Sequence, residues 1–172
     1  MQKNGWDRAD TIVGVSGGVN RFTPDTYAPQ LAIDVTALRR PVGLVIRGTV
    51  EWDSNFEIKS RPFKTRAASL ALGPGMQMGK NRFGLAVALL AVFRYWEVTR
   101  ADIVDAKEKL AVDFGAGLYV RGFFYLTHFA GLYLQSGVEM FPRARQIVIE
   151  DGPGKRLGLF HIPFNLGIFI QF

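Results

Sequence analysis

Phe160-His-Ile-Pro-Phe-Asn-Leu-Gly-Ile-Phe-Ile-Gln-Phe172 is the stretch of sequence that indicates the fold most directly. Each even-numbered position from Phe160 to Phe172 is apolar. The other face is mixed and carries His161, Asn165, Gly167 and Gln171, together with Phe169. A strict period of two over this length predicts a β-strand with one face in an apolar environment and the other in a mixed one.

Seven earlier segments show the same alternation, which gives eight predicted strands. They cover about 9–21, 29–39, 42–53, 66–79, 82–97, 110–121 and 126–141. The connections between them alternate long, short, long, short, long, short, long, with polar loops at 53–64, 99–109 and 142–156 and a short turn around Gly122-Phe123-Phe124. Short turns at one end and longer loops at the other are typical of an antiparallel meander with both chain ends on the same side. We therefore predict an all-β, eight-stranded antiparallel up-and-down transmembrane β-barrel, with residues 1–172 as a single domain.

Composition supports strands rather than helices in the membrane. Hydrophobic residues make up 48% and charged residues 21% of the 172 residues. The longest apolar run, from Phe83 to Phe93, is far shorter than the roughly 20 residues of a membrane-spanning helix. As a tilted strand the same run rises roughly 25 Å, the height of an outer-membrane apolar band. Met1 to Trp6 contains no apolar signal-peptide region, so we expect a mature sequence with an initiator Met.

The C-terminal spacing also carries a family resemblance. Asn165, Gly167, Ile170 and Phe172 resemble the C-terminal assembly signal of bacterial outer-membrane barrels. The whole chain is similar to the small eight-stranded family that includes the OmpA transmembrane domain and OmpX. This resemblance implies a bacterial outer-membrane location with periplasmic termini, contact with outer-membrane lipid and lipopolysaccharide, and insertion by the barrel assembly machinery. Compared with OmpX-like proteins the loops are modest, and no protruding β-sheet is expected.

A soluble, lipocalin-like ligand-binding barrel is the alternative fold. In that case the apolar face would point inward and the polar face toward water. The second face of the predicted strands is small and polar with few charges, which is sparse for a solvated exterior. A narrow eight-stranded lumen filled by side chains fits it better.

Charged side chains of both signs fall on the predicted lumen face. They are Asp34, Arg47, Glu51, Arg94, Asp113, Arg121 and Glu139, joined by Gln135, Tyr119 and Tyr133. Isolated charges in so dry a space are costly, so these groups must pair. The resulting network either plugs the barrel or acts as a gate whose rearrangement admits small ions.

Catalytic and metal signals are weak. The chain has two histidines and no cysteine, which excludes disulfides and cysteine-ligated metal. His128 falls on the lipid face near a short turn, and His161 falls on the lumen face. No nucleophile–base pair emerges, so we expect no enzyme, no metal and no cofactor. A lipid-modifying enzyme would require His161 to meet a serine and a carboxylate.

The net charge of +6 and the pI near 9.8 point to an anionic partner. No nucleic-acid-binding motif is present, so we expect no nucleic acid. The basic residues gather at the long-loop end, either as a solvated rim or as contacts to lipopolysaccharide phosphates; the candidates for such contacts are Lys59, Arg61, Lys64, Arg143 and Arg145. Aromatic girdles are expected at both ends of the barrel: Trp6, Phe83, Phe123, Tyr125 and Phe172 at one, and Trp52, Phe93, Tyr95 and Phe160 at the other.

Together these features predict a non-enzymatic outer-membrane barrel with a side-chain-filled lumen. Its role would lie in envelope integrity, in surface or lipopolysaccharide interaction, or in the membrane part of an assembly with an envelope protein partner. The alternative function is a minor pore or transporter for small solutes.

Overall fold

The computed structural model describes residues 10–23, 26–39, 41–58, 61–80, 82–100, 109–142, 146–147, 155–156 and 159–172. Eight long strands form a closed barrel: β1 (Asp10–Thr23), β2 (Thr26–Arg39), β3 (Val42–Ile58), β4 (Arg61–Lys80), β5 (Phe83–Arg100), β6 (Lys109–Tyr125), β7 (Ala130–Met140) and β10 (Phe160–Gln171). Two short strands, β8 (Gln146–Ile147) and β9 (Lys155–Arg156), pair with each other between β7 and β10. Within the described ranges, no helix is long and apolar enough to cross a membrane.

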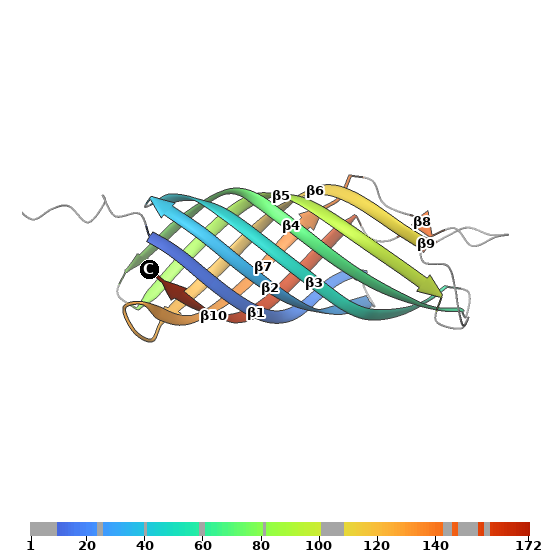
Figure 1. Cartoon of the computed structure of the whole chain (residues 1–172), viewed down its shortest axis with the longest axis horizontal. Helices are drawn as coiled ribbons and strands as arrows, with labels where there is room; N and C mark the ends of the chain where they lie inside the picture. The colour runs from blue at the N-terminus through green and yellow to red at the C-terminus, as the bar shows by residue number, and fades with distance from the viewer. Residues whose placement is uncertain are drawn as a thin grey trace, which may run out of the picture.

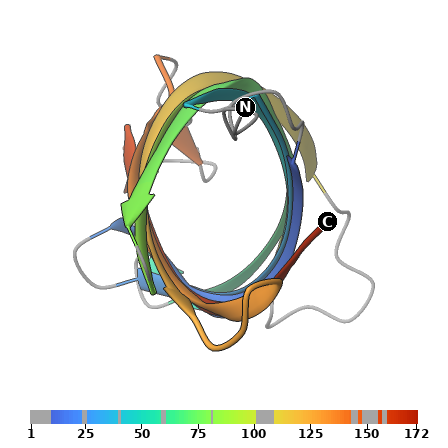
Figure 2. The ribbon, with the colours of Figure 1, turned by 90° about the vertical axis from the view of Figure 1, so that its left-hand side faces the viewer.

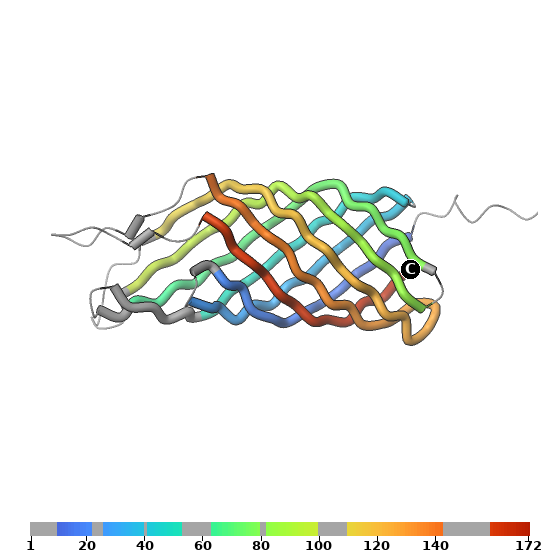
Figure 3. The backbone as a smooth tube through the Cα atoms, turned by 180° about the vertical axis from the view of Figure 1, so that it is seen from behind, coloured from blue at the N-terminus to red at the C-terminus, as the bar shows by residue number. Residues whose placement is uncertain are grey.

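Neighbouring barrel strands are antiparallel, and β10 closes the barrel by pairing with both β7 and β1 (Figures 1 and 3). A path that starts at Gly122 of β6 and steps to the paired residue on each next strand goes once around the barrel. It returns to β6 at Val112, ten residues from its start. The path is Gly122, Leu134, Leu166, Gly17, Leu31, Val50, Ala68, Tyr95 and Val112. This stagger tilts the strands against the barrel axis and leaves a lumen just wide enough for side chains to fill. The predicted eight-stranded, antiparallel up-and-down barrel is confirmed.

The closed wall, seen end-on in Figure 2, separates two kinds of side chain. Large apolar residues are exposed on the outside of every barrel strand, for example Leu31, Leu70, Phe114 and Ile168. The polar and charged residues at alternate positions are buried in the lumen. An apolar exterior around a buried polar interior is the reverse of a soluble ligand-binding barrel, which argues against the lipocalin-like alternative.

The strict alternation of long loops and short turns is wrong. Only residues 24–25 separate β1 from β2, and only residues 59–60 separate β3 from β4, because the strands continue through the expected polar loops. Hydrophobic alternation marks the part of a strand that faces an apolar medium. Beyond that part, two strands can stay paired through their backbones without any alternation of hydrophobicity. The register from Ser54↔Thr65 to Ile58↔Arg61 is an example.

The extended strands form a protruding sheet, contrary to expectation. β3 pairs with β2 only as far as Glu51, and β6 pairs with β7 only from Ala116 onward. Beyond these points β3, β4, β5 and β6 remain paired with one another, up to Ile58↔Arg61 and Val98↔Lys109. In Figure 1 these four strands run past the ends of β1 and β2. We call this end the loop end, and the end that holds Asp10 and Phe172 the turn end.

The last short turn also differs from prediction. Gly122, Phe123 and Phe124 lie within β6, and the turn is formed by residues 126–129. Thr127 accepts a hydrogen bond at its hydroxyl from the backbone N–H of Ala130 (3.0 Å). As a result, Phe123 is 3% exposed inside the lumen and Tyr125 is half-buried, so neither belongs to the outer girdle. Phe83, Phe172, Trp52, Phe93, Tyr95 and Phe160 are exposed on the outside as expected, whereas Trp6 lies outside the described residues.

Candidate functional site

The lumen is the candidate site, and its side chains are arranged in four levels along the barrel axis. Strand β6 runs through all of them, with Phe123 nearest the turn end, then Arg121, then Tyr119, and Asp113 nearest the loop end. Two levels are mainly apolar and two are charged. The pairing of strands fixes which side chains meet at each level.

An aromatic plug fills the turn end. It consists of Ile12, Leu38, Phe123, Tyr133 and Phe169, with Ala86 and Tyr125 packed against it. The Phe123 and Phe169 rings meet edge to face with centroids 5.1 Å apart, a favourable arrangement for aromatic pairs. Nearer the end, Gln77 donates a hydrogen bond to the Tyr125 hydroxyl (3.0 Å), which itself donates to Gln171 (3.2 Å). The plug therefore closes this end with both packing and hydrogen bonds.

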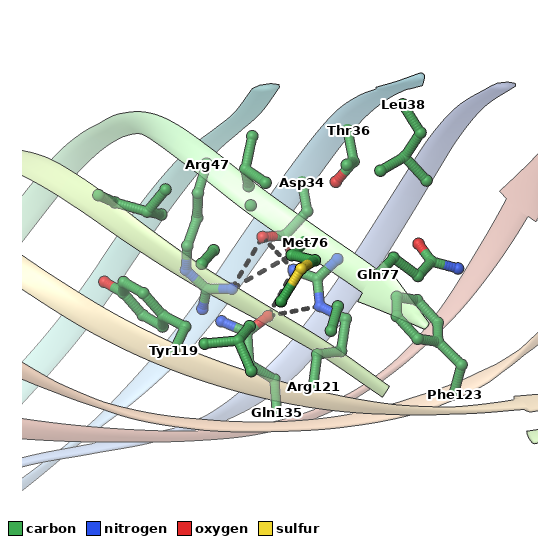
Figure 4. A pocket seen from close by; sticks show the side chains of 16 residues that line it. Asp34, Thr36, Leu38, Arg47, Met76, Gln77, Tyr119, Arg121, Phe123 and Gln135 are labelled. Carbon is green, nitrogen blue, oxygen red and sulfur yellow. Dashed lines mark hydrogen bonds and ion pairs between the residues drawn. The ribbon is translucent and has the colours of Figure 1, made fainter. Parts of the chain in front are cut away.

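The turn-half cluster lies directly above the plug and is centred on Asp34. The Asp34 carboxylate contacts Arg47 Nη1 (3.0 Å) and Arg121 Nη2 (2.6 Å), and it accepts a hydrogen bond from the Tyr133 hydroxyl (2.9 Å). Arg121 also donates to Gln135 (Nε to Oε1, 2.8 Å). Figure 4 shows Asp34 between the two guanidinium groups. Two buried positive charges therefore share one buried negative charge.

A second apolar level separates the two charged levels. It consists of Val45, Ala71, Leu90, Val92, Tyr119 and Phe141, with Ala88 packed against it. Sequence reasoning missed Leu90 and Val92 as lumen residues. Their stretch of β5 is apolar on both faces, and hydrophobicity alone cannot separate the faces there.

The loop-half cluster is centred on Arg94, which is 1% exposed. Its guanidinium pairs with Glu51 and with Glu139 (Nη1 to Oε2, 2.9 Å), and Nη1 also contacts His161 Nδ1. The Tyr119 hydroxyl donates to Glu139, and Asn20 Nδ2 donates to Glu51 Oε1 (2.7 Å). One buried positive charge is therefore shared by two buried carboxylates, the reverse of the turn-half cluster.

Each charged cluster accepts a hydrogen bond from one tyrosine of a neighbouring level, and each of these tyrosine rings lies against two glycines. A Cβ added at Gly14 or Gly167 would lie 2.8 Å from the Tyr133 ring. A Cβ at Gly117 or Gly137 would lie 2.6 or 2.7 Å from Tyr119. Such distances are too short for real contacts, so these positions have room only for glycine while the rings stay in place. Gly167 belongs to the stretch that resembles an assembly signal, and here it also makes space for Tyr133.

The structure brings six of the seven charged lumen candidates into these two clusters. The seventh, Asp113, is buried and pairs with Arg94 in the register between β5 and β6. His161 is 2% exposed and packs against Trp96 and Phe141, whereas His128 is exposed in the turn. In the part of the chain that the structure describes, no group of three or more His, Asp or Glu side chains could hold a metal ion.

The other predicted residues lie on the wall or outside the described ranges. Asn165 and Gly167 point into the lumen, whereas Ile170 and Phe172 are exposed outside. Of the proposed lipopolysaccharide contacts, Lys64 is exposed near the loop end of β4, and Arg61 is described only as the first residue of that strand. Lys59, Arg143 and Arg145 lie outside the described residues.

Comparison with known proteins places this geometry among solved barrels. No protein-family model and no curated protein matches the chain. The structure of Neisserial surface protein A matches 95% of this chain and 97% of its own, with a TM-score of 0.65 and 8% identity. A major outer membrane protein from Thermus thermophilus matches 96% and 100%, with a TM-score of 0.64 and 15% identity.

A third match is Ail, the attachment invasion locus protein of Yersinia pestis, solved with the heparin analogue sucrose octasulfate. It covers 96% of this chain and 99% of its own, with a TM-score of 0.57 and 10% identity. Identities this low establish the fold and leave function open. The chain therefore has the fold of the small eight-stranded outer-membrane β-barrels.

Proposed function

We propose that this chain is a non-enzymatic barrel of the bacterial outer membrane that carries a protruding sheet at the cell surface. The observation that supports this proposal is a distribution of side chains opposite to that of a soluble protein. Large apolar side chains are exposed around the wall, and charged side chains are buried inside it. In water such an exterior would aggregate, because exposed apolar patches this extensive mark a lipid or protein contact. In a bilayer it is the expected surface of a closed barrel.

The proposed orientation places the turn end in the periplasm and the loop end outside. Long connections usually lie on the outer side of outer-membrane barrels, and the two longest gaps between barrel strands, 101–108 and 141–159, both lie at the loop end. The extension of β3–β6 would then lie beyond the outer leaflet, where it could contact other surface molecules. Protease treatment of intact cells that carry a cleavage site inserted at residues 59–60 should cut the chain, whereas a site at residue 81 should stay protected. Cleavage only at residue 81 would reverse the orientation.

We propose that the barrel is closed to solutes in its resting form. Two observations support closure: the aromatic plug fills the turn end, and buried ion pairs cross the lumen at two levels. An eight-stranded lumen filled in this way has no continuous aqueous path. Purified protein in planar bilayers should produce no stable single-channel steps, and regular steps would contradict this closure.

A gated pore for small ions is the second candidate. Its support is that each charged cluster contains a buried atom without a hydrogen-bond partner, Arg47 Nη2 in one and Glu51 Oε2 in the other. Groups with unused hydrogen-bonding capacity can exchange partners. If the lumen is a gate, replacing Arg94 by a neutral residue should make brief conductance steps frequent. The aromatic plug around Phe123 should stay in place in this variant.

The basic residues near the loop end are proposed to contact lipopolysaccharide phosphates. Lys64 is exposed on β4 beside the end of the apolar belt, and Arg61 begins the same strand. Replacing Lys59, Arg61 and Lys64 together by Ala should reduce the lipopolysaccharide that co-purifies with the barrel. Arg39→Ala, at an exposed position of the turn end, is the matched control. Equal retention by both variants would exclude this contact and leave a solvated rim.

A further inference from the structure

The turn-half cluster carries an excess of buried positive charge. Arg47 and Arg121 both pair with Asp34, and the remaining described partner of Arg121 is the uncharged Gln135. Of the other buried acids, Glu51 and Glu139 contact Arg94 in the loop-half cluster, beyond the apolar level, and Asp113 lies opposite Arg94 in the register of β5 and β6. Glu139 attracts Arg47 only from across that level, without a direct ion pair to it. An uncompensated charge in a dry interior is costly unless something of opposite sign comes near it.

Arg47 provides a free donor at this position. Its Nη1 donates to both oxygens of Asp34 (3.0 and 3.2 Å), whereas its Nη2 is buried and has no hydrogen-bond partner among the described residues. The whole side chain is 2% exposed, so bulk water does not reach it. A guanidinium N–H in this state can bind an acceptor, and a negatively charged acceptor would also offset the excess charge.

A cavity lies beside these groups. It has a volume of about 30 Å³, and Arg47, Arg121, Asp34, Thr36 and Tyr119 are among its lining residues (Figure 4). A cavity needs roughly 10–15 Å³ to hold one water, so this one has room for two or three water-sized occupants. Below it, Phe123 and Leu38 belong to the aromatic plug. The space is therefore too small for a phosphate ester or an organic acid.

We infer that the lumen contains a built-in binding site for a small monovalent anion of halide type, held by Arg47 Nη2 beside Arg121. The anion completes the charge balance of the turn-half cluster, with two guanidiniums facing one carboxylate and one halide. It also fills the cavity and satisfies the buried donor. This inference does not depend on the proposed role at the cell surface, because it concerns the interior of the folded barrel only.

Halide-dependent stability tests the site. The refolded barrel in detergent is heated in sodium chloride or bromide and, at the same ionic strength, in sodium gluconate, whose anion is too large for the cavity. The midpoint of unfolding should rise with halide concentration and then saturate. Arg47→Met should weaken the apparent halide affinity by about tenfold or more, the effect of losing one charged hydrogen bond.

Glu51→Gln is the matched control, because it removes a buried charge on the same strand and leaves Arg47, Asp34 and Arg121 in place. Its halide response should equal that of the unmodified protein. A midpoint that does not depend on halide, or an Arg47→Met variant that keeps the full response, would overturn the inference and leave water as the occupant. If Arg47→Met fails to fold, crystals of the unmodified barrel grown in bromide decide. An anomalous peak within hydrogen-bonding distance of Arg47 supports the site, and the absence of one excludes it.

Discussion

The two charged halves of the lumen are built from the same types of side chain in opposite proportion. The turn-half cluster has Arg47 and Arg121 for one carboxylate, whereas the loop-half cluster has Arg94 for Glu51 and Glu139. Each also has a tyrosine hydroxyl on a carboxylate. Among the described residues, Arg47 Nη2 in the turn half and Glu51 Oε2 in the loop half have no hydrogen-bond partner, and in the loop half the same is true of Arg94 Nε and Asn20 Oδ1.

This difference shows that charge is unbalanced locally, with arginine in excess in the turn half and carboxylate in excess in the loop half. The apolar level of Leu90, Val92 and Val45 lies between the halves and keeps their ion pairs separate. Tyr119 links them, since its ring lies 5.5 Å from the Arg47 guanidinium and its hydroxyl donates to Glu139. A mutation that removes one charge should therefore have an effect that depends on which half loses it.

The largest effect is expected when the loop half loses its arginine. Arg94→Met leaves Glu51 and Glu139 buried without their cation, which should lower the free energy of unfolding by about 3–5 kcal/mol. Arg47→Met leaves Asp34 paired with Arg121, so it should cost less, about 1.5–3 kcal/mol for the charged hydrogen bonds that it removes. Urea titration of the barrel in lipid vesicles measures both values.

Equal losses for the two arginine variants would mean that the local imbalance has no energetic consequence. A triple variant provides the control for Arg94. With Glu51→Gln and Glu139→Gln added to Arg94→Met, most of the lost stability should return, because the two carboxylates that contact Arg94 directly are then uncharged.

Removal of a tyrosine hydroxyl tests the same difference between the two halves, with a smaller expected loss of stability. Tyr119→Phe removes the hydroxyl donor from Glu139, which then shares Arg94 with Glu51, and should cost about 1.5–3 kcal/mol. Tyr133→Phe removes a donor from Asp34, which keeps two guanidiniums, and should cost under about 1 kcal/mol. A larger loss for Tyr133→Phe than for Tyr119→Phe in the same urea titration would contradict the proposed proportions.

The sequence predicts much of this interior because a strand has only two faces. Once the alternation is known, Asp34, Arg47 and Arg94 must lie on the side opposite Leu31, Ile46 and Phe93. That argument needs no knowledge of pairing. It also correctly places Phe169 and His161 inside, although one of them is apolar, because their neighbours fix the parity of the strand.

Which charges meet depends on the stagger of the barrel, and hydrophobicity does not encode it. Arg47 lies opposite Asp34 on the neighbouring strand, but Arg94 reaches Glu51 and Glu139 across the lumen from strands that are not its neighbours. The protruding part of β3–β6 was missed for a related reason. Outside an apolar medium, consecutive pairs such as Ser54↔Thr65 and Asn55↔Lys64 place polar residues on both faces, so the sequence resembles a loop.

The glycine positions test whether packing differs between the halves in the way that charge does. Gly14→Ala and Gly117→Ala drive a Cβ into the rings of Tyr133 and Tyr119, whose atoms are the nearest neighbours at these positions, so both should cost about 1–3 kcal/mol. Gly48→Ala is the control, because nothing lies within 4 Å of its added Cβ, and its stability should be unchanged. Strongly unequal losses would show that packing, as well as charge, distinguishes the halves.

The smallest effect is expected for Glu51→Gln, although it removes a fully buried charge. Arg94 contacts two carboxylates directly, so this change still leaves it paired with Glu139, and Asp113 remains opposite it on β6. The new amide keeps an oxygen that can accept the hydrogen bond from Asn20 Nδ2. The free energy of unfolding should change by less than about 1 kcal/mol, in either direction.

Glu139→Gln also leaves one carboxylate for Arg94, but it weakens the bond from the Tyr119 hydroxyl as well, so it should cost more. If Glu51→Gln instead lowers the free energy of unfolding as much as Arg94→Met does, then Arg94 requires the charge of Glu51. In that case the loop half carries no excess negative charge.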